Sequence, residues 1–373
     1  MRAGMLLLWM AAVSLPAAAT QQVTVAQLEQ ALAAAHGRTD AETAALIYDL
    51  QLSERLNAAG LARLNSDLPG EKTRQALLAV ADASAFLAPP DEQIVGHATP
   101  DAASLRAMMV KLVDYVNTTV RQLPNFIATR KTAAFEDRLS EDRLEATGLV
   151  GYSYQPLHEV GSSSVRVTYR DRREVVDEGA AKNDKHGNQA GGLVTAGEFG
   201  PMLSRVAADA IQGKISWSRW EKGSAGDAAV FHYAVPAEKS HYKVEFCCVT
   251  DEVDLAGAHE DRHVFSETAS YHGEIAFDAD SGAILRMTME AEMPAGELVS
   301  GAAMLVEYGP VEIGGKQYIC PSKSISILKA HTIQATGMYS RANYKGAAKT
   351  FLNDVEFGQY RRFGAETRIV PSN

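Results

Sequence analysis

The chain has 373 residues, of which 46% are hydrophobic and 22% charged, and this is an ordinary globular composition. Its net charge of −10 argues against nucleic-acid binding and against electrostatic docking on anionic lipid, because both need a basic surface. The length is sufficient for two domains that each bury a core.

The first nineteen residues have the pattern of a secretory signal peptide. Arg2 precedes an apolar run at residues 5–15, and small residues at 16–19 supply a cleavage site. This run is too short to span a bilayer, and no later segment approaches the roughly 20 apolar residues that a spanning helix needs. We therefore expect an exported protein, periplasmic or secreted, that does not span the membrane. Because no cysteine follows the small residues, we also expect no lipid anchor.

Residues 20–90 are predicted to form a helical module. Apolar residues recur at spacings of three and four in three stretches, which glycine and proline pairs separate. Thr24 and Asp40 are expected to cap the first two helices. The second helix is expected to reach Leu56, since Leu50 and Leu56 continue its apolar stripe.

Residues 91–147 are predicted to connect this module to the rest of the chain. They contain one more helix, at about 101–123, followed by a mixed apolar and basic run. Within this run, Asn125, Arg130 and Lys131 are either the polar rim of a cleft or solvated charges on a packed connector, and we favour the second interpretation.

Residues 148–373 are predicted to form a β domain. The apolar period changes there from 3.6 to 2, as is typical of half-buried antiparallel strands. We expect roughly ten strands and one internal helix at 198–212, without the helices that parallel strands need between them. The predicted fold class is α+β, with a helical module followed by a large, curved, mostly antiparallel sheet that is half-barrel-like.

The stretch 277–321 carries a characteristic order of turn and strand residues. A strand ending in FDADSG turns back into ILRM and is followed by EYGP, IGG and CP. This order resembles the periplasmic lipoprotein-carrier-like family, the half-barrels of outer-membrane lipoprotein sorting, over about residues 148–358, and the whole chain is also similar to secreted bacterial proteins. The resemblance implies a curved sheet wrapped around a helix, with an apolar cavity for acyl chains. Its Asp and Gly residues serve hairpin turns, so it specifies a fold rather than the chemistry of a site.

Four aromatic residues on neighbouring predicted strands are candidates for lining a ligand cavity: Trp217, Trp220, Phe231 and Tyr233. Strand alternation places Phe231 and Tyr233 on one face, whereas Trp217 and Trp220, three residues apart, are expected on opposite faces. Ordinary core packing is the alternative, and we favour it.

One string has the spacing of metal ligands. His259-Glu260-Asp261-Arg262-His263 matches H-E-x-x-H, in which two histidines one helical turn apart bind zinc and the glutamate activates water. The motif needs a helix, but the preceding residues are typical of a loop, so we favour a solvated loop over a metal site at His259 and His263. We find no other catalytic motif or cofactor fingerprint, and we predict no catalytic residues and no cofactor.

The three cysteines are Cys247, Cys248 and Cys320. Export would permit a disulfide between Cys320 and one of the adjacent pair, but adjacent strand residues face opposite ways, so one thiol is left over. The alternative is that all three are small core residues.

Three functions are consistent with these patterns. The first is a non-enzymatic exported protein whose curved sheet binds an apolar ligand or a lipidated partner. The second is a protein–protein interaction module that docks through the N-terminal helices. The third is a zinc hydrolase acting through His259, Glu260 and His263.

Overall fold

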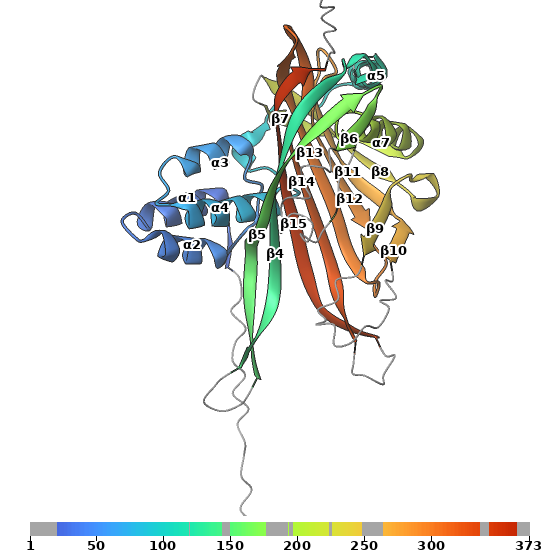
Figure 1. Cartoon of the computed structure of the whole chain (residues 1–373). Helices are drawn as coiled ribbons and strands as arrows, with labels where there is room; N and C mark the ends of the chain where they lie inside the picture. The colour runs from blue at the N-terminus through green and yellow to red at the C-terminus, as the bar shows by residue number, and fades with distance from the viewer. Residues whose placement is uncertain are drawn as a thin grey trace, which may run out of the picture.

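The computed structural model describes residues 21–118, 120–143, 150–176, 193, 197–223, 226–247, 264–335 and 343–363. This part of the chain forms a helical module and a large sheet that carries further helices (Figure 1). None of the described helices is long and apolar enough to cross a membrane.

The helical module contains four α-helices and a two-stranded parallel sheet. The helices are α1 (Val25–Ala34), α2 (Asp40–Tyr48), α3 (Ala58–Asn65) and α4 (Glu71–Ala83), and the strands are β1 (Gln21–Val23) and β2 (Leu50–Leu52). Their inward faces form one apolar cluster, in which Leu28, Ile47 and Leu77 are fully buried.

The helix caps follow the prediction at one position and differ at another. Thr24 caps α1 as expected. Thr39, rather than Asp40, caps α2. The Asp40 carboxylate instead accepts hydrogen bonds from the backbone N–H groups of Lys72 (3.1 Å) and Thr73 (2.9 Å), so it caps α4 from a neighbouring helix.

The second helix is shorter than predicted. It ends at Tyr48, Leu50 joins β2, and Leu56 lies in the loop that leads to α3. The reason is tertiary: the carbonyl oxygen of Asp49 accepts a hydrogen bond from the Gln21 amide (3.1 Å), so this backbone pairs with β1 instead of continuing the helix.

Eleven strands of the described chain form one antiparallel sheet, in the order β3-β7-β8-β11-β12-β13-β14-β15-β4-β5-β6. The strands are β3 (Ile94–Val95), β4 (Phe126–Arg143), β5 (Val150–Arg170), β6 (Arg173–Val176), β7 (Lys214–Lys222), β8 (Asp227–Val235), β11 (Ser270–Asp278), β12 (Ile284–Glu292), β13 (Val299–Ile313), β14 (Lys316–Ala335) and β15 (Asn343–Arg362). A separate hairpin pairs β9 (Lys243–Cys247) with β10 (Val264–Thr268). The sheet is open, with β3 and β6 at its edges.

The sheet starts earlier in the chain than predicted. β3 and β4 fall within residues 91–147, and β4 pairs with both β5 and β15. Apolar and basic residues are mixed in this segment because the two faces of β4 lie in different surroundings. Phe126 and Ala128 are buried in an apolar cluster, whereas Lys131 lines a cleft on the other face.

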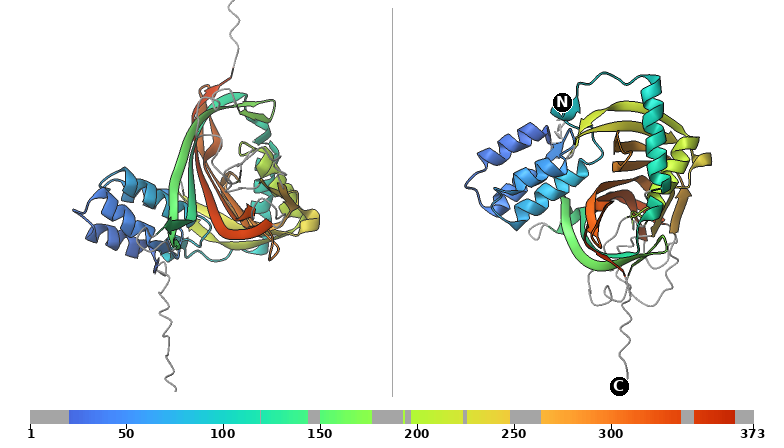
Figure 2. Two further views of the ribbon diagram at one scale, coloured as in Figure 1. Left: turned by 60° about the horizontal axis from the view of Figure 1, so that its bottom comes forward. Right: turned by 90° about the horizontal axis from the view of Figure 1, so that it is seen from above.

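The two faces of the curved sheet are covered by different helices (Figure 2). α5 (Ala102–Thr118) and α7 (Pro201–Gln212) lie on the concave side, and the helical module lies on the convex side. α4 packs there on β4, β13, β14 and β15 through a small apolar cluster that includes Ala79, Phe135 and Leu352. The predicted α+β class, with a half-barrel-like antiparallel sheet and an internal helix near 198–212, is confirmed.

Candidate functional site

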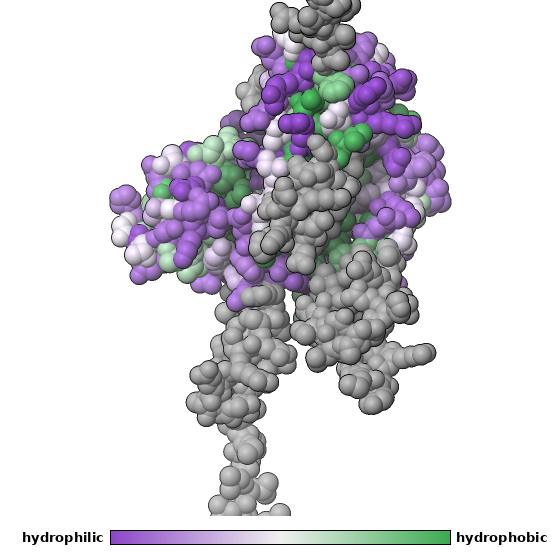
Figure 3. All heavy atoms as spheres, viewed as in Figure 1, coloured by the Kyte–Doolittle hydropathy of each residue, from purple (hydrophilic) through white to green (hydrophobic). Residues whose placement is uncertain are grey.

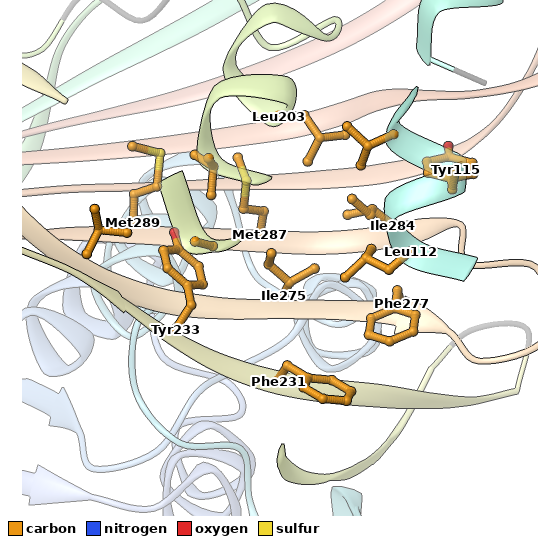
Figure 4. Packing of buried hydrophobic residues seen from close by; sticks show 14 of the residues in the cluster. Leu112, Tyr115, Leu203, Phe231, Tyr233, Ile275, Phe277, Ile284, Met287 and Met289 are labelled. Atoms are coloured by element: carbon orange, nitrogen blue, oxygen red, sulfur yellow. The ribbon is translucent and has the colours of Figure 1, made fainter. Parts of the chain in front are cut away.

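The four candidate aromatic residues lie together on the concave face of β7 and β8. Phe231 (3% exposed) and Tyr233 (0% exposed) are buried in an apolar cluster that α5 and α7 cover, and Trp217 and Trp220 pack against it partly buried. Figure 4 shows Phe231 beside Phe277, with Leu112 and Tyr115 reaching in from α5 and Leu203 from α7. The four residues therefore share one apolar environment.

The two tryptophans share a face, so the expectation that they point to opposite sides is wrong. A β-bulge between Trp217 and Arg219 makes Ser218 an extra residue, which shifts the alternation by one. As a result, the Trp217 and Trp220 rings meet edge to face with centroids 5.1 Å apart, and Trp217 contacts Phe231 at 5.5 Å.

The middle of the concave face combines flexible apolar side chains with small polar ones. Met287, Met289 and Met304 are each at most 4% exposed there. Beyond them, the Leu193 carbonyl oxygen accepts hydrogen bonds from Ser326 Oγ (3.4 Å) and Asn353 Nδ2 (3.3 Å). Leu193 is therefore held on this face by polar groups of β14 and β15.

A buried glutamate, Glu198, and a partly buried one, Glu174, lie near the start of α7. Glu198 is fully buried, neither of its carboxylate oxygens has a hydrogen-bond partner, and Arg130 Nη2 lies 3.8 Å from its Oε1. Glu174 Oε2 accepts a hydrogen bond from the Gly197 amide (2.8 Å). Burial, together with the negative charge of Glu198, raises the pKa of Glu174 to about 7.

The outcome differs among the three polar residues at the start of β4. Arg130 is not a solvated charge, because its side chain is only 11% exposed and faces Glu198. Asn125 Oδ1 accepts a hydrogen bond from the Asp171 amide (3.0 Å), and Lys131 lines a cleft. Lys131 therefore fits the interpretation as a cleft rim, whereas Asn125 and Arg130 belong to a packed connector.

An ionic cluster joins the module to the convex face. It consists of Arg55, which precedes α3, and of four residues on β7, β11 and β12, namely Arg219, Glu221, Glu274 and Arg286. Glu221 bonds Arg55 and accepts a hydrogen bond from Arg286 Nη1 at 2.7 Å. Burial alone would raise the pKa of Glu221, but the Arg286 hydrogen bond and the charges of the three arginines outweigh burial and lower it to about 2.

A cleft of about 760 Å³ separates α3 and α4 from the convex face of β4, β5, β14 and β15. At its inner end, Lys323 Nζ lies 2.7 Å from Asp82 Oδ1 of α4 and 3.1 Å from Asp354 Oδ2. This triad is a second charged connection between the module and the sheet.

The remaining candidates do not form a site among the described residues. His259, Glu260 and His263 lie outside them, and no group of three or more His, Cys, Asp or Glu within them could hold a metal ion. Cys320 is a free, buried thiol whose pKa burial raises to about 12, so it is a core residue. Cys248 lies outside the described residues.

Among the described residues of the helical module, Leu87 after α4 is an exposed large apolar residue, at 37%. In α1 to α4, all within the described chain, no large apolar side chain is exposed. The visible surface of the module in Figure 3 carries mostly hydrophilic residues.

Sequence reasoning missed the ionic cluster and the Lys323 triad. Arg55 and Glu221 are 166 residues apart, so no spacing relates them. The available signal was the pair Arg219 and Glu221, two charges of opposite sign at alternate positions of a strand that also carries two tryptophans.

Comparisons with known proteins add little. No family model matches this sequence, and no curated protein matches it. Among solved structures, the chain is similar to a domain assigned to outer membrane lipoprotein sorting from Vibrio parahaemolyticus, with 12% identity, 70% of this chain and 95% of that chain covered, and a TM-score of 0.29. That description names the kind of protein that residues 277–321 resemble, but a likeness this distant carries no argument about function.

Proposed function

We propose that this chain is a non-enzymatic binding protein whose concave face holds an apolar ligand, such as the acyl chain of a lipid or of a lipidated protein. The observation that carries the proposal is the way in which α5 covers the aromatic cluster. Only Leu112, Tyr115 and Val116, among its 17 residues, are buried, and Leu105, Met108 and Met109 pack against the cluster partly buried. A lightly anchored helix over an apolar concave face is suited to exchange its contacts for those of a ligand.

The free energies of the two sets of contacts are of comparable size. Exposing the three buried side chains of α5 costs about 2 kcal/mol each, and the partly buried Leu105, Met108 and Met109 add about half as much, or roughly 9 kcal/mol in all. An acyl chain of about twelve carbons gains roughly 10 kcal/mol when its methylene groups leave water, at about 0.8 kcal/mol each. The three methionines nearby add side chains that adapt to ligands of different shape.

The proposal includes export of the protein, on the pattern of residues 1–19. A mature chain that begins near residue 20 would contain two tryptophans, Trp217 and Trp220, because Trp9 lies in the signal pattern. Tryptophan fluorescence of the mature protein would then report on the proposed site alone.

The test is a titration of delipidated protein with a long-chain fatty acid, followed by tryptophan fluorescence and native mass spectrometry. We expect saturable binding of one ligand per chain. Trp217→Glu should weaken the affinity at least about tenfold, because it places a charge in the apolar site. Val110→Glu, on the exposed side of α5, is the matched control and should leave the affinity unchanged. Binding that is absent, or that both variants weaken equally, would refute the proposal.

A further inference from the structure

The cleft on the convex face has the size of a small-molecule site. Its volume of about 760 Å³ lies within the range of roughly 300–1,000 Å³ that is usual for such sites. α3 and α4 form one wall, and the strands β4, β5, β14 and β15 form the other. The cleft lies on the opposite face of the sheet from the apolar cluster, so it is independent of the function proposed above.

Most of the charged side chains that line the cleft already have partners. Arg74 bonds Glu71 (3.0 Å), and Lys323 bonds Asp354 (3.1 Å) together with Asp82. The charged residues that are left, among the described residues of the lining, are two carboxylates and one lysine: Glu159, Glu356 and Lys131. None of these three has an ion-pair partner within the described chain.

An acceptor atom without a donor adds to this imbalance. Asn65 has a buried Oδ1 atom with no hydrogen-bond partner, whereas the Asp354 carboxylate bonds Lys323 and shares a hydrogen bond with Asp82, whose pKa burial raises. Burial, with the charge of Glu71 in addition, raises the pKa of Glu159, so this carboxylate also lacks stabilisation. Buried acceptors and carboxylates of this kind are stabilised by a ligand that brings hydrogen-bond donors and positive charge.

The wall formed by α3 and α4 has an apolar strip beside the paired Glu71 and Arg74. Ala58, Leu61 and Ala62 of α3 and Leu78 of α4 form it. On the sheet side of the cleft, Glu356 of β15 is the direct cross-strand neighbour of Lys131 of β4, which pairs in turn with Ser164 of β5. Glu159 lies five residues before Ser164, roughly 13–16 Å along the strand. The carboxylates are therefore well separated, and the apolar strip of α3 and α4 faces them.

We propose that the cleft binds a flexible aliphatic polyamine. Its ammonium groups contact the carboxylates of Glu159 and Glu356, and its methylene segments pack on Leu61 and Leu78. The separation of the two glutamates suits a chain with several ammonium groups better than a single amine.

Two other ligand classes fit the cleft less well. An anion would need a free cluster of cations, but Arg74 and Lys323 are already paired with carboxylates. A sugar usually stacks on an aromatic ring, and no aromatic residue belongs to the lining of this cleft.

The test is a calorimetric titration of the full chain with spermidine. Glu159→Gln/Glu356→Gln removes the two unpaired carboxylates of the cleft. The matched control, Glu238→Gln/Glu312→Gln, makes the same charge change at two exposed residues that do not line it. We expect one spermidine per chain for the unmodified protein and the control, and an affinity about tenfold weaker for the cleft variant.

Three results would overturn the proposal: no saturable binding of spermidine, equal weakening in both double variants, or tighter binding of a neutral sugar such as maltose. Equal weakening would mean that the net charge of −10, rather than the cleft, attracts the ligand. Since all four glutamates are at least partly exposed, the variants are expected to fold, and their thermal unfolding midpoints check this. Fatty-acid binding by the cleft variant should stay unchanged, which separates this test from that of the concave face.

Discussion

The two faces of the sheet hold their helices by different interactions. On the concave face, α5 and α7 pack on apolar side chains of β8, β11 and β12. On the convex face, the module is attached by the ionic cluster and by the Lys323 triad, in addition to a small apolar cluster around Phe135. One face therefore depends mainly on non-directional apolar contacts and the other on paired charges.

This difference indicates which helices can move. Apolar contacts are non-directional, and one apolar surface can replace another at little cost. Buried charges need their own partners, and the loss of one partner leaves the other uncompensated. A ligand can therefore compete with α5 on the concave face, whereas the module on the convex face is expected to stay in place.

The largest effect is expected for Phe231→Ala on the concave face. Phe231 is buried, lies at a centroid distance of 5.6 Å from Phe277, and also contacts Trp217. Its truncation should lower the free energy of unfolding by about 3–5 kcal/mol, measured by urea denaturation. Val110→Ala, at an exposed position of α5, should change it by less than about 0.5 kcal/mol. A loss below about 1 kcal/mol for Phe231→Ala would show that the cluster is not packed as described.

Glu221→Gln should destabilise the convex face by about 3 kcal/mol, because it leaves three buried arginines with one carboxylate. The same substitution at Glu29, in an exposed pair with Arg63, should cost less than about 1 kcal/mol.

The stability that Glu221 contributes should depend on pH with a definite sign. The folded-state pKa of Glu221, about 2, lies below its ordinary value of 4.5, so this stabilisation is complete above pH 4.5 and is lost as the pH falls towards 2. Urea denaturation at several pH values measures both effects, and equal losses for the two variants would contradict this account.

Glu174→Gln tests the opposite sign on the concave side. The pKa of Glu174 is raised from 4.5 to about 7, so the folded state favours the protonated carboxyl. Its contribution to stability is complete below pH 4.5 and is lost as the pH rises through 7, by at most roughly 3 kcal/mol. The variant should lack this decline in a comparison of unfolding free energies at pH 4.5 and pH 8. If the unfolding free energies of the variant and the unmodified protein fall equally between pH 4.5 and pH 8, a group other than Glu174 causes the decline.

The smallest effect is expected for Gly282→Ala in the hairpin that α5 contacts. Gly282 has φ +75°, and a Cβ atom there would lie 2.3 Å from the Lys111 carbonyl oxygen of α5. We expect a loss of about 1–2 kcal/mol and a looser α5. Gly315→Ala, with φ +79° and no atom within 4 Å of its Cβ, carries the backbone strain alone and is the control. Thermal unfolding measures the difference in stability loss between the two variants. Equal losses would mean that α5 moves away from the added methyl group at no cost in stability.

Much of the architecture could be predicted from local patterns. Thr24 at its cap and Gly282 at a turn with positive φ follow from residues next to them in the chain. The predictions failed where a distant segment intervenes. Ser218 enters a bulge that rotates Trp217, and Asp49 pairs with Gln21 instead of extending a helix.

The sequence by itself determined that this is an α+β protein whose helical front precedes a curved antiparallel sheet. A change of apolar period from 3.6 to 2 is a property of neighbouring residues, and it survives in any packing that buries those residues. Only the tertiary structure decided how the two parts meet. Arg55 bonds Glu221, and Asp82 bonds Lys323. The cleft that Glu159 and Glu356 line lies between the helical module and the sheet. These contacts join residues that are far apart in the chain. They depend on the tertiary structure because the free energy of a buried charge depends on the partner that the fold places beside it.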